Sequence, residues 1–211
     1  MKKILFEGKT YPVSFEPMPD ILGKKLGKEV LQTYLQLLEK VQTQPRKYYQ
    51  EIKTFCSKYP DSSEVVNLLT FAHLQNKNLL EAEKLIEETY WKYPHYLFAR
   101  INYADQCIRK KKLSEINKIF PLFDLKILYP EKKIFHISEL RGYWILMAHY
   151  HQALKNREKA LDYYETVCKI DPYHSATLHL KKKLIQISFT HRFFLKLSNG
   201  LRPLLRLCNF K

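Results

Sequence analysis

Glycine and long apolar runs are both scarce in this chain. Of its 211 residues only five are glycine, and leucine, lysine, glutamate and tyrosine are abundant, a balance typical of a nearly all-helical protein. No stretch approaches the roughly 20 apolar residues that span a bilayer. The apolar run after Met1 stops at Glu7 and Gly8, too early for a secretory signal. We therefore expect an all-α protein of the cytoplasm, peripheral to a membrane at most.

Motifs that carry chemistry are absent as well. The chain has no Gly-rich phosphate loop and no HExxH or GxSxG sequence. His149 and His151 form the closest histidine pair, but on a helix they diverge by about 200° and cannot easily share a metal ion. No CxxC pair occurs, which favours buried, reduced thiols, and the cysteines are Cys56, Cys107, Cys168 and Cys208. We expect no enzyme, no metal and no cofactor.

What the chain does contain is a set of residues at regular spacing. Seven positions fit the pattern W-x2-L-G-x2-Y, then A-x3-F, then P. They are Trp144, Met147, Ala148, His151, Ala160, Tyr164 and Pro172. This line resembles the signature of the tetratricopeptide-repeat (TPR) family, whose unit is about 34 residues. The resemblance implies pairs of antiparallel helices that stack into a right-handed α-solenoid with a concave protein-binding face.

Prolines and alanines extend the resemblance beyond one unit. Pro60 and Pro94 are 34 residues apart, as expected where a proline ends each second helix. Ala82 and Ala160 would let helices cross at close range, whereas Pro121 would interrupt a second helix. A generic helical bundle is the alternative. We expect about four helical pairs: two clear units at 63–96 and 141–174, and two degenerate units at 29–62 and 97–130.

Shorter segments flank the predicted solenoid. Residues 3–15 read as a small β-hairpin with Glu7-Gly8 as its turn, and we expect it to pack on the first helix. That helix is predicted to begin after an Asp20 N-cap, and Pro45 to open the next one. The chain then divides into a hairpin arm at 1–19, the solenoid with its capping helix at 20–189, and a basic tail at 190–211.

The segment 124–140 is an insertion relative to the repeat. Pro130 and Pro172 are 42 residues apart instead of 34. Residues 134–137 read as extended chain, and Ser138 is the predicted cap of the following helix. We interpret the insertion as a loop that bridges a distorted layer. The alternative is that it covers or lines the groove.

The resemblance also implies which side chains line the groove, because in TPR proteins the first helix of each pair forms the concave face. Carried over by position, it gives Tyr34, Leu37, Asn67, Phe71, Gln75, Asn102, Asp105, Arg109, Ile145, His149 and Gln152. The two asparagines and His149 would orient a peptide through hydrogen bonds, and Phe71 and Ile145 would seat an apolar side chain. The lysines with which one TPR subclass grips chaperone C-termini are absent from the matching positions, so that ligand is not expected.

The tail concentrates positive charge. The chain has a formal net charge of +15 and no acidic residue after Asp171. A short basic amphipathic helix is predicted after Gly200, and it needs a surface to lie on: the protein's own body, an anionic membrane, or a partner protein or RNA. The tail residues we single out are Arg192, Phe193, Phe194, Arg202 and Arg206.

The sequence therefore predicts a non-enzymatic adapter or assembly factor that binds a peptide or helix of another protein in its groove. One alternative is a peripheral membrane protein anchored by the tail at 190–211. Another is a helical-repeat RNA binder, which the composition disfavours because Arg109 is the one fixed cation among the predicted groove positions. Repeat folds serve many roles, so this prediction rests on the resemblance.

Overall fold

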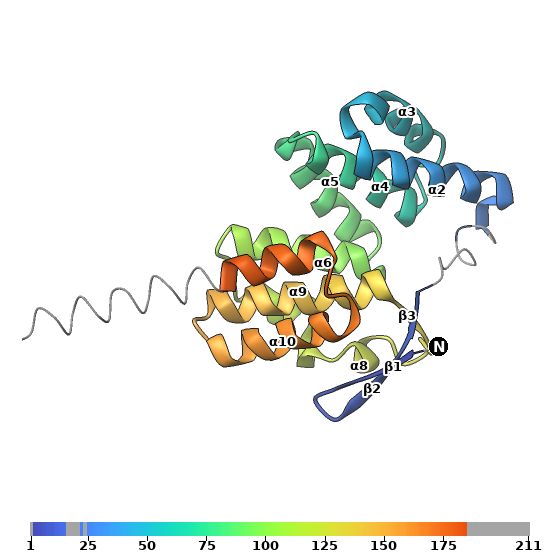
Figure 1. The fold of residues 1–211 in the computed structure, drawn as a ribbon. Helices are drawn as coiled ribbons and strands as arrows, with labels where there is room; N and C mark the ends of the chain where they lie inside the picture. The colour runs from blue at the N-terminus through green and yellow to red at the C-terminus, as the bar shows by residue number, and fades with distance from the viewer. Residues whose placement is uncertain (1, 16–21, 23–24, 185–211) are drawn as a thin grey trace, which may run out of the picture.

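A computed structural model describes residues 2–15, 22 and 25–184. In this part the protein is mostly helical and carries a small sheet of three strands (Figure 1), which confirms the expected helical class and the N-terminal strands. The predicted Asp20 cap and the tail at 190–211 lie outside the described residues. The helices are α2 (Lys28–Thr43), α3 (Pro45–Lys58), α4 (Ser63–Gln75), α5 (Leu79–Lys92), α6 (Leu97–Arg109), α7 (Glu115–Ile119), α8 (Leu125–Leu128), α9 (Ile137–Ala153) and α10 (Arg157–Ile170), followed by a helix over 175–184.

The helices pack in consecutive pairs. Helix α2 contacts α3, α4 contacts α5, α6 contacts α7, and α9 contacts α10. The first helices of the pairs also touch one another in chain order, α2 with α4, α4 with α6, and α6 with α9. The chain therefore advances by one pair at a time, as Figure 1 shows.

The turns within the pairs repeat in detail. Lys77, Lys111 and Lys155 have left-handed φ angles of 61°, 59° and 61°, and the first two are 34 residues apart. In each turn the N–H of the next residue donates to a carbonyl inside the preceding helix, which closes a Schellman-type end. These bonds join Asn78 to His73, Lys112 to Cys107 and Asn156 to His151, at 3.0, 2.8 and 2.9 Å.

Prolines end the second helices, as predicted. Tyr59 and Tyr93 precede prolines, and both cap their helices with extended φ angles of −133° and −129°, since a proline disfavours helical geometry in the residue before it. Pro121 does interrupt its layer: α7 has only five residues, and the 3₁₀ turn Pro121–Phe123 follows it. Pro45 opens α3 at its first turn. The helix predicted from Asp20, however, is interrupted at Gly27, whose φ of 92° precedes α2.

Buried apolar side chains form an N-terminal core and a C-terminal core. The N-terminal core joins α2, α3 and α4 through residues such as Leu37, Ile52 and Leu68. The C-terminal core surrounds α9, with Trp144 fully buried, and includes side chains of α6, α7, α10 and the strands. Ala82 and Ala160 are fully buried, in agreement with the predicted close approach of their helices.

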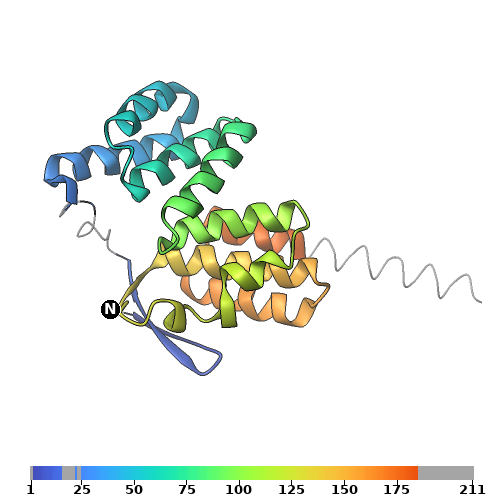
Figure 2. The same cartoon turned by 180° about the vertical axis from the view of Figure 1, so that it is seen from behind.

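The hairpin forms where it was predicted but packs elsewhere. Strands β1 (Lys2–Phe6) and β2 (Lys9–Ser14) are antiparallel around Glu7-Gly8. The expectation that they pack on the first helix is wrong, because the ring of Phe6 lies 4.9 Å from that of Tyr163 in α10, and Tyr11 lies 5.7 Å from Trp144 in α9. Figures 1 and 2 show the hairpin beside α8 to α10, away from α2.

The insertion explains this position, since it supplies the third strand. Strand β3 (Phe135–His136) pairs in parallel with β2, and Asp124 accepts hydrogen bonds from Lys9 and Tyr11 of the hairpin. The predicted Ser138 cap is wrong: His136 is the N-cap of α9, and its Nδ1 accepts from the N–H of Ser138 while Glu139 accepts from the N–H of His136. An imidazole and a carboxylate here form a reciprocal capping box.

Candidate functional site

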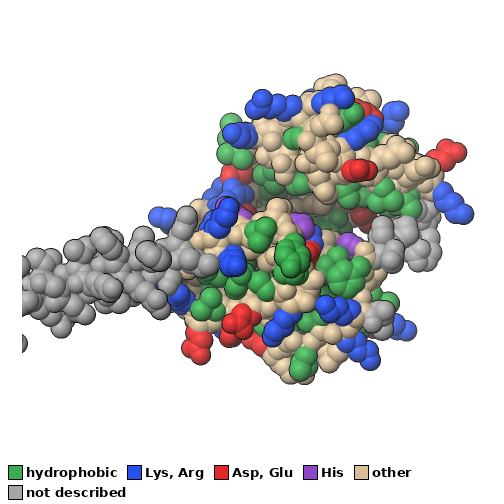
Figure 3. Space-filling model, in the orientation of Figure 1, with side chains coloured by type: hydrophobic (Ala, Val, Ile, Leu, Met, Phe, Trp, Pro, Cys, Tyr) green, Lys and Arg blue, Asp and Glu red, His purple; other side chains and the backbone are tan. Residues whose placement is uncertain are grey.

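The first helices of the pairs expose a face that ends in a hollow at each side. We call the side chains of α4, α6 and α9 between these hollows the inner face. Figure 3 shows the surface indented between the upper helices and the lower ones, with histidine side chains along the indentation. Because α4, α6 and α9 contact one another in order, a ligand lying across them would touch several pairs.

An apolar hollow of about 400 Å³ lies at one side of the inner face. Leu35 and Leu38 of α2 and Phe98 of α6 line it together with Lys132 and Glu139. Lys132 and Glu139 form an ion pair whose carboxylate is 10% exposed, so these charges neutralise each other. Burial, followed by the charge of Glu64, raises the pKa of Tyr34 on the same wall to about 12, so its hydroxyl stays neutral.

A polar hollow of about 570 Å³ lies at the other side. It brings together four of the predicted groove residues, Asp105, Arg109, His149 and Gln152, and adds Lys183 from the helix over 175–184. The guanidinium Nε of Arg109 donates to Asp105 at 3.0 Å, and its Nη1 donates to Glu83 at 3.2 Å. Arg109 is thus held in place by two carboxylates.

His149 is the group in this hollow whose hydrogen bonding is incomplete. Its Nε2 is buried and has no hydrogen-bond partner among the described residues. Burial, followed by the positive charge of Lys183, lowers the pKa of His149, so the ring is neutral at pH 7. Lys183 itself forms no ion pair with a described residue. Buried polar atoms in folded proteins normally have partners, so His149 Nε2 and the exposed ammonium of Lys183 are groups of this hollow with hydrogen-bonding capacity left.

The two predicted asparagines lie between the hollows and bind each other. Asn102 Nδ2 of α6 donates to Asn67 Oδ1 of α4 at 2.8 Å. This bond leaves Asn67 Nδ2 and Asn102 Oδ1 without a partner in the described part of the chain, one a donor and the other an acceptor. The bond therefore joins two helix pairs and still presents a donor and an acceptor on the inner face.

Four other predicted groove residues, Leu37, Phe71, Gln75 and Ile145, line neither hollow. Phe71 packs partly buried against the N-terminal core and Ile145 against the C-terminal core. Leu37 is 1% exposed and belongs to the N-terminal core, so its assignment to the groove is wrong. Gln75 is exposed at the end of α4. All five tail residues lie outside the described residues.

Of the apolar hollow the sequence interpretation found Tyr34 but missed the other apolar lining residues, although a signal for them was present. Leu31, Tyr34, Leu35 and Leu38 follow the i, i+3, i+4, i+7 spacing of one helix face. Leu37 and Val41, on another face of α2, already serve the core. Leu31, Tyr34 and Leu38 of the stripe also pack against this core, but they are only partly buried, and Leu35 is 36% exposed. The stripe therefore keeps apolar surface for a ligand and identifies the wall of the hollow.

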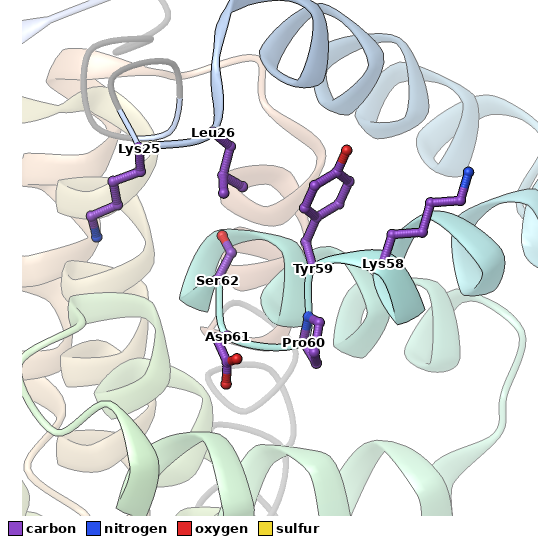
Figure 4. Close-up of a pocket in the computed structure, with 7 residues that line it drawn as sticks. All are labelled: Lys25, Leu26, Lys58, Tyr59, Pro60, Asp61 and Ser62. Atoms are coloured by element: carbon purple, nitrogen blue, oxygen red, sulfur yellow. The ribbon is translucent and has the colours of Figure 1, made fainter.

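A smaller hollow of about 240 Å³ lies at the turn before α4 (Figure 4). Leu26 and Tyr59 line it, but Lys25 and Lys58 point away from each other to either side. Asp61 of the same turn is paired with Lys92 at 2.6 Å. The charges at this place do not converge on a common point, so we do not count it as part of the site.

Neither a metal-binding cluster, nor a membrane-spanning helix, nor similarity to a known protein identifies the function of the described part of the chain. No group of three or more His, Cys, Asp or Glu in the described part of the chain is arranged to hold a metal ion. Among the described residues no helix is long and apolar enough to cross a membrane. No family model, no curated protein and no solved structure matches this chain.

Proposed function

We propose that the protein is a TPR-like right-handed α-solenoid that acts without catalysis, as a cytoplasmic adapter or assembly factor. Its partner would be a segment of another protein, bound along the inner face. The observation that carries the proposal is the row of α4, α6 and α9 with an apolar hollow at one side and a polar hollow at the other. Stacked helical pairs with such a face are typical of protein-binding repeats.

The two hollows would contribute differently to the affinity and the specificity of binding. The apolar one can bury a side chain such as leucine, which is worth about 1.5–3 kcal/mol when burial is complete. The polar one offers hydrogen-bond donors, which contribute less affinity and more specificity. Phe71 and Ile145 line neither hollow, whereas Leu35, Leu38 and Phe98 line the apolar one, so we assign the apolar contact to these three.

The two alternative functions, RNA binding and membrane anchoring, gain less support from the inner face. Three carboxylates and three lysine or arginine side chains line the two hollows, so this face lacks the excess of positive charge by which proteins bind a polyanion such as RNA. Membrane anchoring depends on the tail at 190–211, which is outside the described residues. It stays a prediction that vesicle flotation of the full chain would test.

The test is a photo-crosslinking experiment in cells that express the chain. A photoreactive amino acid placed at Leu35 on the wall of the apolar hollow, or at Gln152 in the polar one, should crosslink to the same partner protein. The same amino acid at Leu80, which is 82% exposed on α5, serves as the control and should not give this product.

A matched pair of substitutions locates the binding surface independently. Leu35→Asp adds a charge to the apolar hollow, and Leu80→Asp adds the same charge outside both hollows. Partner capture should be lost in the first variant and kept in the second, with unchanged helicity by circular dichroism. Equal capture by both variants would show that the inner face is not the binding surface.

A further inference from the structure

The two hollows lie at a fixed distance along the same helices. On α6, Phe98 lines the apolar hollow and Arg109 the polar one, and these residues are eleven apart. On α9, Ser138 and His149 line the same two hollows and are also eleven apart. At the rise of an α-helix both separations are about 16 Å. A bound segment thus meets an apolar site and a polar site at this spacing.

The polar hollow fits a carboxylate. Lys183 has an ammonium group without an ion pair among the described residues, and the Nε2 of His149 is buried without a partner there. Arg109 also lines this hollow, and its guanidinium has more donors than its bonds to Asp105 and Glu83 use. Two cations and a neutral imidazole that can donate would each bind a carboxylate oxygen.

The space between the hollows fits an extended chain better than a helix. Asn67 Nδ2 and Asn102 Oδ1 offer one donor and one acceptor midway along the face. A helix satisfies its own backbone groups, whereas an extended peptide has free N–H and C=O groups that need such partners. At the reach of an extended chain, about 16 Å corresponds to about five residues.

We propose that the partner is an extended peptide segment in which an aspartate or glutamate side chain lies about five residues from a bulky apolar residue. The apolar side chain enters the hollow lined by Leu35 and Phe98, and the carboxylate binds Lys183, Arg109 and His149. This inference rests on the proposed function, since it specifies the chemistry and the register of the segment bound there.

The probe is a random 12-residue peptide library displayed on phage, with the full chain as the target. The peptides are fused through their C-termini, so an enriched acid must be a side chain. We expect enrichment of sequences with Asp or Glu about five positions from Leu, Phe or a similar residue. A free peptide from this set should lose about tenfold in affinity when its acid is changed to the amide, because a hydrogen-bonded charge is removed.

Paired variants of the protein make the test specific. Lys183→Glu should weaken this peptide by about tenfold or more, and a peptide carrying Lys in place of the acid should recover binding to that variant. Lys182→Glu makes the same change of net charge on a neighbouring exposed residue outside the polar hollow. It should change affinity by less than about twofold, as exposed, screened charges do.

The outcomes separate the two proposals. Enriched peptides that depend on Leu35 but lack the acid, or that bind Lys183→Glu unchanged, overturn the inference and leave the proposed function intact. Enriched peptides that are insensitive to Leu35→Asp, or a library without any enriched peptide, overturn both. The spacing is judged in the same data: an acid about eleven residues from the apolar position would indicate a helical ligand and contradict the extended one.

Discussion

The N-terminal and C-terminal cores are built from the same kind of helical pair, yet they are completed differently. In the N-terminal core the apolar faces of α2, α3 and α4 cover one another, together with Leu22 from the segment before α2. In the C-terminal core the second helix α7 is cut short before Pro121, which leaves part of α9 uncovered. Phe6 and Tyr11 of the hairpin, with Phe120 after α7, pack there against Trp144 and Tyr143.

The comparison shows how a pair with a shortened second helix is completed. A missing turn of helix is replaced by side chains from a hairpin far away in the sequence and from the insertion. The replacement is held by polar contacts as well as by packing: Tyr143 donates to the carbonyl of Phe123 at 2.8 Å, and Asp124 binds the hairpin. The C-terminal core should therefore be the more cooperative of the two.

The largest effect is expected at the centre of the C-terminal core. Trp144 is fully buried and contacts both hairpin aromatics. Trp144→Ala should destabilise the protein by about 3–5 kcal/mol, the range for a large aromatic residue in a core. Urea denaturation followed by circular dichroism would measure it, with Trp144→Phe as a milder control. A loss under 1 kcal/mol would show that the hairpin does not complete this core.

A matched pair of leucines compares the two cores directly. Leu37 and Leu140 are both at most 1% exposed, one in each core. Either substitution by alanine should cost about 2–5 kcal/mol. By hydrogen exchange, Leu37→Ala should expose mainly α2 to α4, whereas Leu140→Ala should expose the hairpin together with α9 and α10. Identical exchange patterns would mean that the cores unfold as one unit.

A smaller effect is expected at the polar contact that ties the hairpin to the insertion. Burial acts to raise the pKa of Asp124, but the bonds from Lys9, the N–H of Lys126 and Tyr11 outweigh it and lower the pKa. A lowered carboxyl pKa adds stability above the unfolded-state pKa, and that stability is lost as the pH falls through the folded-state value. Asp124→Asn should cost about 1.5–3 kcal/mol at pH 7.

The pH dependence provides the control for this substitution. The difference between wild type and Asp124→Asn should shrink in acid, because the wild-type carboxyl is then protonated as well. Guanidinium denaturation at neutral and acid pH would measure it. A difference that is constant with pH would indicate that the variant acts through packing and not through the charge.

The smallest effect is expected at His151, and it should be stabilising. The ring stacks on Tyr163 at 5.5 Å, and its Nδ1 is buried without a partner among the described residues. Burial lowers the pKa of His151, so the unfolded chain binds more protons and stability falls as the pH drops through the ordinary histidine pKa. His151→Phe should add about 1 kcal/mol at pH 7 and more near pH 5.5.

Thermal denaturation across this pH range would test the variant. Its melting temperature should fall less steeply on acidification than that of the wild type. Some decline will remain, since burial also lowers the pKa of His73 and His136. A slope equal to the wild-type slope would show that His151 does not contribute to the pH dependence.

Most local features of the fold were predictable, whereas most long-range ones were not. The hairpin turn at Glu7-Gly8 and the interruption at Pro121 depend on neighbours in sequence, and both were predicted correctly. The candidate site was predicted in part: Asp105, Arg109, His149 and Gln152 do come together. The i, i+4 and i, i+3 spacings put each pair on one face of its helix, and α6 and α9 are in contact. Lys183 was missed, since nothing in its own surroundings in the sequence links it to α6.

The sequence by itself determined the helix boundaries that prolines set, the start of α3 and the ends of α3, α5 and α7, because a proline acts on the backbone within a few residues. Only the tertiary structure decided that the hairpin completes the C-terminal core, that Asn67 and Asn102 bind each other, and that the two hollows are aligned along α6 and α9. These contacts join residues far apart in the chain, and their energies depend on which surfaces the other helices leave uncovered.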